Sequence, residues 1–327
     1  MRTVTRTRIG LLAAVVVVTA AGLVATAPVA LSAETQPAPT GFTNGGRGYL
    51  LDDGKMTPIG VPGAAGTLPF GINNRGQIVG VYDDARGVSH GFLLDHGRFT
   101  TIDHPEAAGV LGGVAGTGVV SINNRGQLVG SYVADSGRAR GFRWDHGRFV
   151  PIDVPGAVET YPFGINDRGQ ITIQTTFPDG STPQFLLDRG RLTRIQYPGT
   201  APDDTLVHKI NARGQVVGVY LDETGVQHGF RLYRGRYTRV DVPDTVLTGL
   251  NQSNARGDLV GYYLDQNGTT VHGLLLRHGR VITFDAPNAD STSAYDINDR
   301  GQIVGAGFNL PYPPTDPAEA QAMTASS

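Results

Sequence analysis

The sequence predicts an all-β protein, a six-bladed β-propeller with four-stranded blades, from three observations. The chain has 46 glycines and 20 prolines, which is typical of short strands joined by tight turns. The two ends of its repeated region carry complementary halves of one unit. An Ile-Asn or Ser-Asn motif also recurs every 43 to 50 residues, with its asparagine at Asn73, Asn123, Asn166, Asn211, Asn254 and Asn298.

The unit Gly71–Asp103 shows the four expected strands in order. The first ends at Asn73, the second is Gly76–Tyr82, the third is His90–Asp95 and the fourth is Arg98–Asp103. Four antiparallel strands in about 44 residues match the length of a propeller blade.

The connections within a unit carry recognisable turn residues. Asn-x-Arg-Gly joins the first strand to the second, with asparagine opening a type I turn and glycine in the left-handed position. Gly97 and its equivalents mark the turn between the third and fourth strands. Segments such as Asp222–Gly225 join the second strand to the third.

The incomplete units at the two ends predict how the ring closes. Arg47–Ala64 matches only the second half of a unit, and Tyr295–Phe308 matches only the first half. A linear solenoid would need atypical capping units at its ends. We therefore interpret the two halves as the sixth blade, with a β-sandwich or a β-solenoid of the same strands as alternatives.

The region before the repeats predicts export. Arg2, Arg6 and Arg8 precede an apolar stretch, and Leu31–Ala33 is a small-residue cleavage site. We interpret 1–33 as a signal peptide rather than a retained membrane anchor. This gives a flexible spacer over 34–46, one propeller domain over 47–308 and a disordered tail over 309–327, in a secreted protein.

Composition limits the classes of partner. The chain has no cysteine, 27 Lys and Arg, and 29 Asp and Glu, and no basic stripe stands out in the sequence. The prediction is therefore no nucleic-acid partner, and no membrane partner after cleavage. Phosphate loops, HExxH and zinc patterns are absent, so we expect no cofactor, no metal and no catalytic residue.

The repeated motifs resemble one known family. His90-Gly91-Phe92, His228-Gly229-Phe230 and His272-Gly273-Leu274 follow the recurring Asn and Gly-Gln motifs as in the extracellular HAF repeat family. The resemblance covers nearly all of 48–305 and implies secretion and repeat architecture, with no activity to transfer. The third unit departs from the pattern at Ile171–Gln174 and at Pro183-Gln184-Phe185.

Polar residues that recur at equivalent positions of several units are interpreted as structural. His90, His228 and His272 are replaced by Arg140 and Gln184 elsewhere, which indicates satisfied hydrogen-bond donors rather than ligands. The aspartates at the end of the fourth strand are expected to accept backbone N–H groups of the following turn. These are Asp103, Asp153, Asp241 and Asp285.

Residues that vary between units indicate where a binding site lies. The connections from each fourth strand to the next first strand are irregular and share one face with the connections from second to third strands. Beside the axis, residues preceding the Asn motif are polar or ionisable in the last three units. A central channel would place these on one side as a binding-site hypothesis: His208, Lys209, Asn251, Gln252, Tyr295 and Asp296.

Three functions compete. The leading hypothesis is a non-catalytic monomer that binds an extracellular protein or glycan through its irregular face. The alternative is an extracellular hydrolase, lactonase or lyase with Asp296 as acid, His208 as base and Lys209 as electrostatic stabiliser. The third is a structural envelope component without a specific ligand.

Overall fold

The computed structural model describes residues 46–108 and 116–308. The expected signal peptide, most of the spacer and the expected tail lie outside these ranges. All regular elements of the described part are β-strands. Within the same ranges no helix has the length and apolar character needed to cross a membrane.

The strands form one eight-stranded sheet and four four-stranded sheets. The larger sheet contains β1 (Arg47–Asp52), β2 (Lys55–Ile59), β3 (Gly66–Ile72), β4 (Ile78–Asp83), β5 (Ser89–Asp95), β6 (Arg98–Ile102), β23 (Ser291–Ile297) and β24 (Ile303–Phe308). The smaller sheets contain, in chain order, β7 (Thr117–Ile122), β8 (Leu128–Val133), β9 (Ala139–Asp145), β10 (Arg148–Ile152), β11 (Glu159–Ile165), β12 (Ile171–Thr176), β13 (Gln184–Asp188), β14 (Arg191–Ile195), β15 (Thr205–Ile210), β16 (Val216–Leu221), β17 (Gln227–Tyr233), β18 (Arg236–Val240), β19 (Leu247–Ser253), β20 (Leu259–Leu264), β21 (Val271–Arg277) and β22 (Arg280–Phe284).

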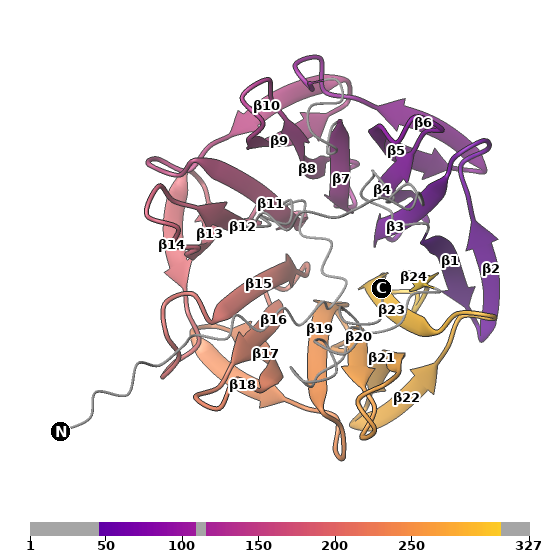
Figure 1. The fold of residues 1–327 in the computed structure, drawn as a ribbon, viewed down its shortest axis with the longest axis vertical. Helices are drawn as coiled ribbons and strands as arrows, with labels where there is room; N and C mark the ends of the chain where they lie inside the picture. Colours follow the sequence, from indigo (N-terminus) through magenta and orange to yellow (C-terminus); the bar gives the residue numbers. More distant parts are fainter. Residues whose placement is uncertain (1–45, 109–115, 309–327) are drawn as a thin grey trace, which may run out of the picture.

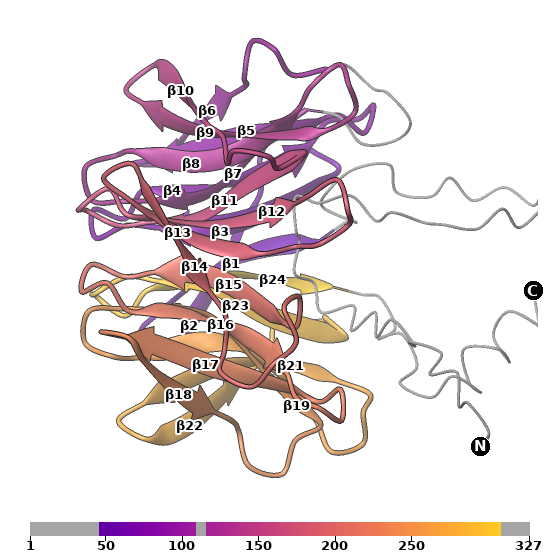
Figure 2. The ribbon, with the colours of Figure 1, turned by 90° about the vertical axis from the view of Figure 1, so that its left-hand side faces the viewer.

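The sheets stand radially around one axis in a β-propeller arrangement (Figure 1). The strands nearest the axis, called here the inner strands, are β3, β7, β11, β15, β19 and β23. Each inner strand contacts the next along the chain, and β23 contacts β3. Seen from the side, the strands run between the two faces of the ring (Figure 2).

The two ends of the described chain pair with each other. β1 lies antiparallel to β24, with Tyr49 opposite Gly305 and Leu51 opposite Ile303. The larger sheet thus consists of the antiparallel runs β23-β24-β1-β2 and β3-β4-β5-β6, joined at the single parallel pair Arg47–Thr67. Pairing β1 with β24 covers two strand edges that would otherwise be open.

The two faces of the ring differ in their connections. The turn face, as it is called here, carries the connections that follow each inner strand and each third strand. The latter are two-residue turns in which both residues, such as His96 and Gly97, have positive φ, as type I′ hairpins require. The irregular face carries the remaining connections, and Gly46 and Phe308 lie at this face.

An aromatic ring packed over a glycine forms the centre of the typical sheet. Phe92 is fully buried opposite Gly80, where an added Cβ would overlap the carbonyl of Leu68. The third unit differs because Ile173 replaces the glycine and is itself fully buried. Its partner Phe185 is only half-buried, so the aliphatic side chain takes over the core position.

Candidate functional site

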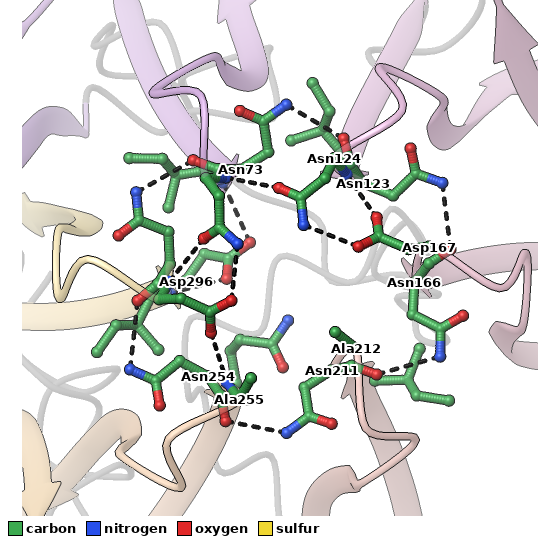
Figure 3. A pocket seen from close by; sticks show the side chains of 18 of the residues that line it. Asn73, Asn123, Asn124, Asn166, Asp167, Asn211, Ala212, Asn254, Ala255 and Asp296 are labelled. Carbon is green, nitrogen blue, oxygen red and sulfur yellow. Dashed lines mark hydrogen bonds between the residues drawn. The ribbon is translucent and has the colours of Figure 1, made fainter.

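A closed ring of asparagine side chains surrounds the axis at the turn face (Figure 3). Each of the six recurring asparagines donates a hydrogen bond from Nδ2 to the backbone carbonyl of the next one, at 3.0–3.2 Å. The last bond runs from Asn298 back to the carbonyl of Asn73. The ring therefore links all inner strands, across 225 residues of sequence at the closing step.

Each ring asparagine also organises its own turn. Asn166 Oδ1 accepts hydrogen bonds from the backbone N–H groups of Arg168 and Gln170, and its Nδ2 donates to Gln170 Oε1 at 2.8 Å. With the bond to the carbonyl of Asn211, all four hydrogen-bonding positions of this amide are used. The predicted turn is confirmed, and the asparagine has a second role between units that the repeat pattern alone did not reveal.

The next residue of each turn lines a small hollow at the axial mouth. Asn124 donates to the Asp167 carboxylate from its backbone N–H at 2.7 Å and from Nδ2 at 2.8 Å. Asn74 Nδ2 donates to Asp299 Oδ2 at 2.7 Å, and the N–H of Asp299 donates back to Asn74 Oδ1 at 2.8 Å. The two remaining turns have alanine at this position, Ala212 and Ala255. The hollow has a volume of about 60 Å³, enough for a few waters and far below the several hundred Å³ of most ligand pockets.

An ion pair fills the axis below this hollow. Lys209 Nζ lies 2.9 Å from Asp296 Oδ2, and both side chains are buried, with exposed fractions of 6% and 4%. The Lys209 ammonium also donates to the carbonyl of Phe70, on another inner strand. Asp296 accepts from the backbone N–H groups of Ile72 and Ile297. Burial lowers the pKa of Lys209 and raises that of Asp296, and their mutual attraction opposes both changes.

The other four predicted site residues are also buried, on β15, β19 and β23. Asn251 Nδ2 donates to the carbonyl of Ala294 at 2.8 Å, and Gln252 Oε1 accepts from the N–H of Ser253. The Tyr295 ring packs against Phe70, with 5.0 Å between ring centroids. The structure thus brings Lys209 and Asp296 into contact and buries all six residues, of which Gln252 and Asp296 also line the axial hollow.

His208 is held as a neutral imidazole. Its Nδ1 donates to the carbonyl of Leu250 at 2.7 Å, while Nε2 has no hydrogen-bond partner among the described residues. Burial lowers its pKa to about 4. A buried histidine that resists protonation does not supply the exposed general base that the alternative function needs.

This lowered pKa predicts an acid-dependent loss of stability. The unfolded chain binds a proton at His208 near pH 6.5 whereas the folded chain binds it near 4, so stability falls by up to about 1.4 kcal/mol per pH unit as the pH drops between these values. We expect His208→Asn to lack this component, because Asn251 makes the equivalent bond in the next unit. Urea unfolding of both proteins at pH 7 and pH 4.5 measures it; equal pH dependence would contradict the assignment.

The third unit departs from the repeat pattern where it contacts β15, the strand that carries His208 and Lys209. Thr172 Oγ1 donates to the carbonyl of His208 at 2.6 Å. Gln174 donates to the carbonyl of Val207, and the N–H of Val207 donates to Gln184. Polar side chains of the third unit thus fix the backbone of β15.

The recurring histidines have structural partners, as predicted, but the aspartates do not act as predicted. The Asp103 and Asp285 carboxylates accept hydrogen bonds from Nδ1 of His90 and His272, both at 2.9 Å, and not from backbone N–H groups of the turn. The N–H that follows the aspartate position donates instead to a threonine at the start of the next inner strand, in all six cases. These threonines stand six residues before the ring asparagines, a constant spacing that could have revealed them: Thr67, Thr117, Thr160, Thr205, Thr248 and Thr292.

A larger hollow of about 270 Å³ lies on the irregular face, between the start of β17 and the connection from β18 to β19. His228 forms one wall, 3.0 Å from Asp222 and 3.1 Å from Asp241. Both ring nitrogens of this imidazole thus face carboxylate oxygens. Arg239 forms an ion pair with Asp241 and keeps half of its side chain exposed.

Apolar side chains complete the wall of this hollow. Val226 and Val246 are exposed by 40% and 39%, which is unusual for large aliphatic side chains among the described residues. Desolvation acts to raise the pKa of Asp222, but hydrogen bonds from Thr224, His228 and Val226 outweigh it and lower that pKa, so the carboxyl is ionised. The hollow therefore offers a guanidinium, carboxylates and an apolar rim to solvent, a combination that suits a small polar ligand group.

Comparison with solved structures shows the fold. Over 80% of this chain and 98% of the other, the structure is similar to a putative TolB from Agrobacterium tumefaciens, at 14% identity and a TM-score of 0.56. It is also similar to TolB from Acinetobacter baumannii, at 13% identity and a TM-score of 0.52, over 81% and 65% of the two chains. At such identities the likeness establishes the β-propeller fold alone.

A six-bladed fungal lectin from Aleuria aurantia has 12% identity and a TM-score of 0.39 over 66% of this chain and 77% of the lectin, too low to support an argument. No protein-family model matches the chain. No curated protein matches it.

Proposed function

We propose that this chain is a secreted, six-bladed propeller of the HAF repeat type. The count of six is supported by the six-membered asparagine ring and by counting each antiparallel run of the larger sheet as one blade. Gln302 donates to Asp52 at 2.9 Å just as Gln77 donates to Asp95 within one run, which supports a blade made from the two ends. Secretion rests on the basic and apolar pattern of 1–33.

The proposed activity is non-catalytic binding of an extracellular ligand at the irregular face. The hollow beside Arg239 is the observation that carries this proposal, because it joins an accessible guanidinium to carboxylates and apolar side chains. A volume of about 270 Å³ accommodates one small hydroxylated or carboxylated group. A glycan presents such a group, and a protein ligand can present one as a side chain.

The hydrolase, lactonase or lyase alternative is less well supported. It needs Asp296, His208 and Lys209 within reach of a substrate, yet Lys209 and Asp296 neutralise each other inside the ring. His208 has an exposed fraction of 3%. A general acid and base must approach the substrate to hydrogen-bond distance, which these positions do not allow.

Replacing Arg239 by alanine is expected to weaken glycan or protein binding by roughly tenfold or more, because it removes a charge-assisted donor from the wall of the hollow. The measurement is saturation-transfer NMR with a panel of neutral and acidic monosaccharides, followed by titration calorimetry of each one that binds.

Arg194→Ala is the matched control. Arg194 has the same position in β14 that Arg239 has in β18, is also exposed, and does not line the hollow. Equal losses for the two variants, or full binding by Arg239→Ala, would rule out this hollow as the binding site.

A further inference from the structure

The turn face gathers basic residues that are dispersed in the sequence. Each connection after an inner strand carries one exposed arginine, two residues after the ring asparagine. These six are Arg75, Arg125, Arg168, Arg213, Arg256 and Arg300. They surround the axial mouth, so the repeat brings together a basic patch although no continuous basic stripe exists in the sequence.

Several of these arginines lie over the turn of a neighbouring unit. The guanidinium of Arg75 lies beside Gly126, and that of Arg300 beside Gly76. A Cβ at Gly214 would overlap the guanidinium of Arg168. Because a glycine has no side chain, the guanidinium can extend along the ring across the turn surface. At these positions the guanidinium therefore reaches from one turn to the next along the circle of arginines.

A second row of cations surrounds the first. The first residue of every outer strand is an exposed lysine or arginine, at the end of the strand that meets the turn face. These residues are Lys55, Arg98, Arg148, Arg191, Arg236 and Arg280.

Several carboxylates of the turn face accept hydrogen bonds from uncharged donors, whereas Asp258 lies 3.8 Å from Arg256 and 3.3 Å from Arg277. Asp95 and Asp145 accept hydrogen bonds from Gln77 and Gln127, at 3.0 Å in both cases. Asp167 and Asp299 accept from neighbouring asparagines and backbone N–H groups. Arg256 is the only arginine of the first row that forms an ion pair with the described residues, so the two rows keep an excess of positive charge.

The irregular face has the opposite charge. Its described connections carry many aspartates and glutamates, and Arg86 and Arg138 are the only Arg or Lys among them. Positive charge is thus concentrated on the turn face and negative charge on the irregular face, although the formal net charge of the chain is only −2. Such a separation orients the molecule as it approaches a charged partner.

We propose that the turn face binds an acidic extracellular polysaccharide, a chain that bears carboxylates. Guanidinium groups pair bidentately with carboxylates, and two concentric rows offer many such pairings to one polymer. This surface lies opposite the ligand hollow of the irregular face and acts independently of it.

The shape of the turn face favours a polysaccharide over the other polyanions. Its two-residue turns are of one length, so no helix or ribbon projects to enter a nucleic-acid groove. Among the described residues, the exposed large hydrophobic side chains are Val226 and Val246 on the irregular face and Val281 and Ile282 on β22. The axial mouth therefore lacks the apolar wedge that inserts into a bilayer and the aromatic platform that stacks bases.

The test is calorimetric binding of the full secreted protein to polygalacturonate at 50 and 200 mM NaCl, with neutral dextran as the uncharged control. The variant is Arg75→Gln/Arg125→Gln/Arg213→Gln, whose three side chains make no ion pair with the described residues. Its matched control is Arg86→Gln/Arg138→Gln/Arg140→Gln, three exposed arginines of the irregular face. Thermal unfolding verifies that both variants fold.

We expect the turn-face variant to bind polygalacturonate on the order of tenfold more weakly. Its affinity should also fall less between 50 and 200 mM NaCl: each guanidinium that no longer pairs with the polymer reduces that fall in affinity by roughly a factor of three. The control variant retains binding. Unchanged affinity of the turn-face variant, or an equal reduction in the control, would overturn the proposal. Tighter binding to duplex DNA or to anionic phospholipid vesicles would overturn the choice of polysaccharide.

Discussion

Replacing Lys209 by methionine is expected to destabilise the protein by about 3–5 kcal/mol at pH 7. The change removes the ammonium 2.9 Å from Asp296 and leaves that carboxylate buried with only backbone N–H groups as donors. The carbonyl of Phe70 loses its donor as well. Urea unfolding followed by intrinsic fluorescence gives the free energy of unfolding of each variant.

The double variant Lys209→Met/Asp296→Asn separates the loss of charge balance from the loss of packing. It restores a neutral axis, so we expect it to recover most of the stability that Lys209→Met loses. If the double variant is less stable than Lys209→Met, the ion pair is not the cause of the effect.

The pH dependence of Lys209→Met provides a second test. Burial raises the pKa of Asp296, and removal of the cation raises it further. A raised carboxyl pKa means that the folded state binds the proton more tightly than the unfolded state, so stability is retained below the unfolded value near 4 and lost as the pH rises above it. The deficit of Lys209→Met relative to the wild type is therefore expected to shrink between pH 7 and pH 4.

The fold could be predicted from the sequence because the same turn and strand motifs recur along the chain. The interval between asparagines gave the unit length, and the turn glycines gave the strand boundaries. The match between Arg47–Ala64 and the half missing after Phe308 predicted the pairing of β1 with β24. Each of these inferences needs only local pattern and the requirement that strand edges be covered.

The arrangement of side chains along the axis was harder to predict from the sequence. Sequence placed Lys209 and Asp296 on inner strands of different units, but the width of the axis decides whether their side chains meet or face water. That width depends on how the sheets pack, for which the repeat interval gives no measure. The two side chains do converge, and their burial and direct contact could be found only from the structure.

Two further features could have been found by following the repeat more closely. Threonine stands six residues before every ring asparagine, and arginine stands two residues after it. With the strand order already predicted, the arginines fall on one face and most of the loop carboxylates on the other. Overall composition hid this separation, because the chain as a whole is nearly neutral.

The second large effect is expected for Asn166→Ala, at about 2–4 kcal/mol, because four hydrogen bonds of a buried amide are lost together. The N–H groups of Arg168 and Gln170 lose their acceptor, and the link to Asn211 in the next unit is broken. Asn124→Ala is the matched control, one residue further along an equivalent turn. We expect it to cost less than about 1 kcal/mol, because water at the mouth replaces its bonds and two other units have alanine there, Ala212 and Ala255.

Asn166→Asp distinguishes the turn from the ring. Aspartate keeps the oxygen that accepts from Arg168 and Gln170, but its second oxygen faces the carbonyl of Asn211 and Gln170 Oε1, two acceptors. If the bonds between units matter, this variant is about as unstable as Asn166→Ala at pH 7 and recovers in acid, when the carboxyl gains a proton to donate. Stability close to wild type at pH 7 would show instead that the turn alone requires an asparagine, and that the closed ring adds little to the cohesion of the sheets.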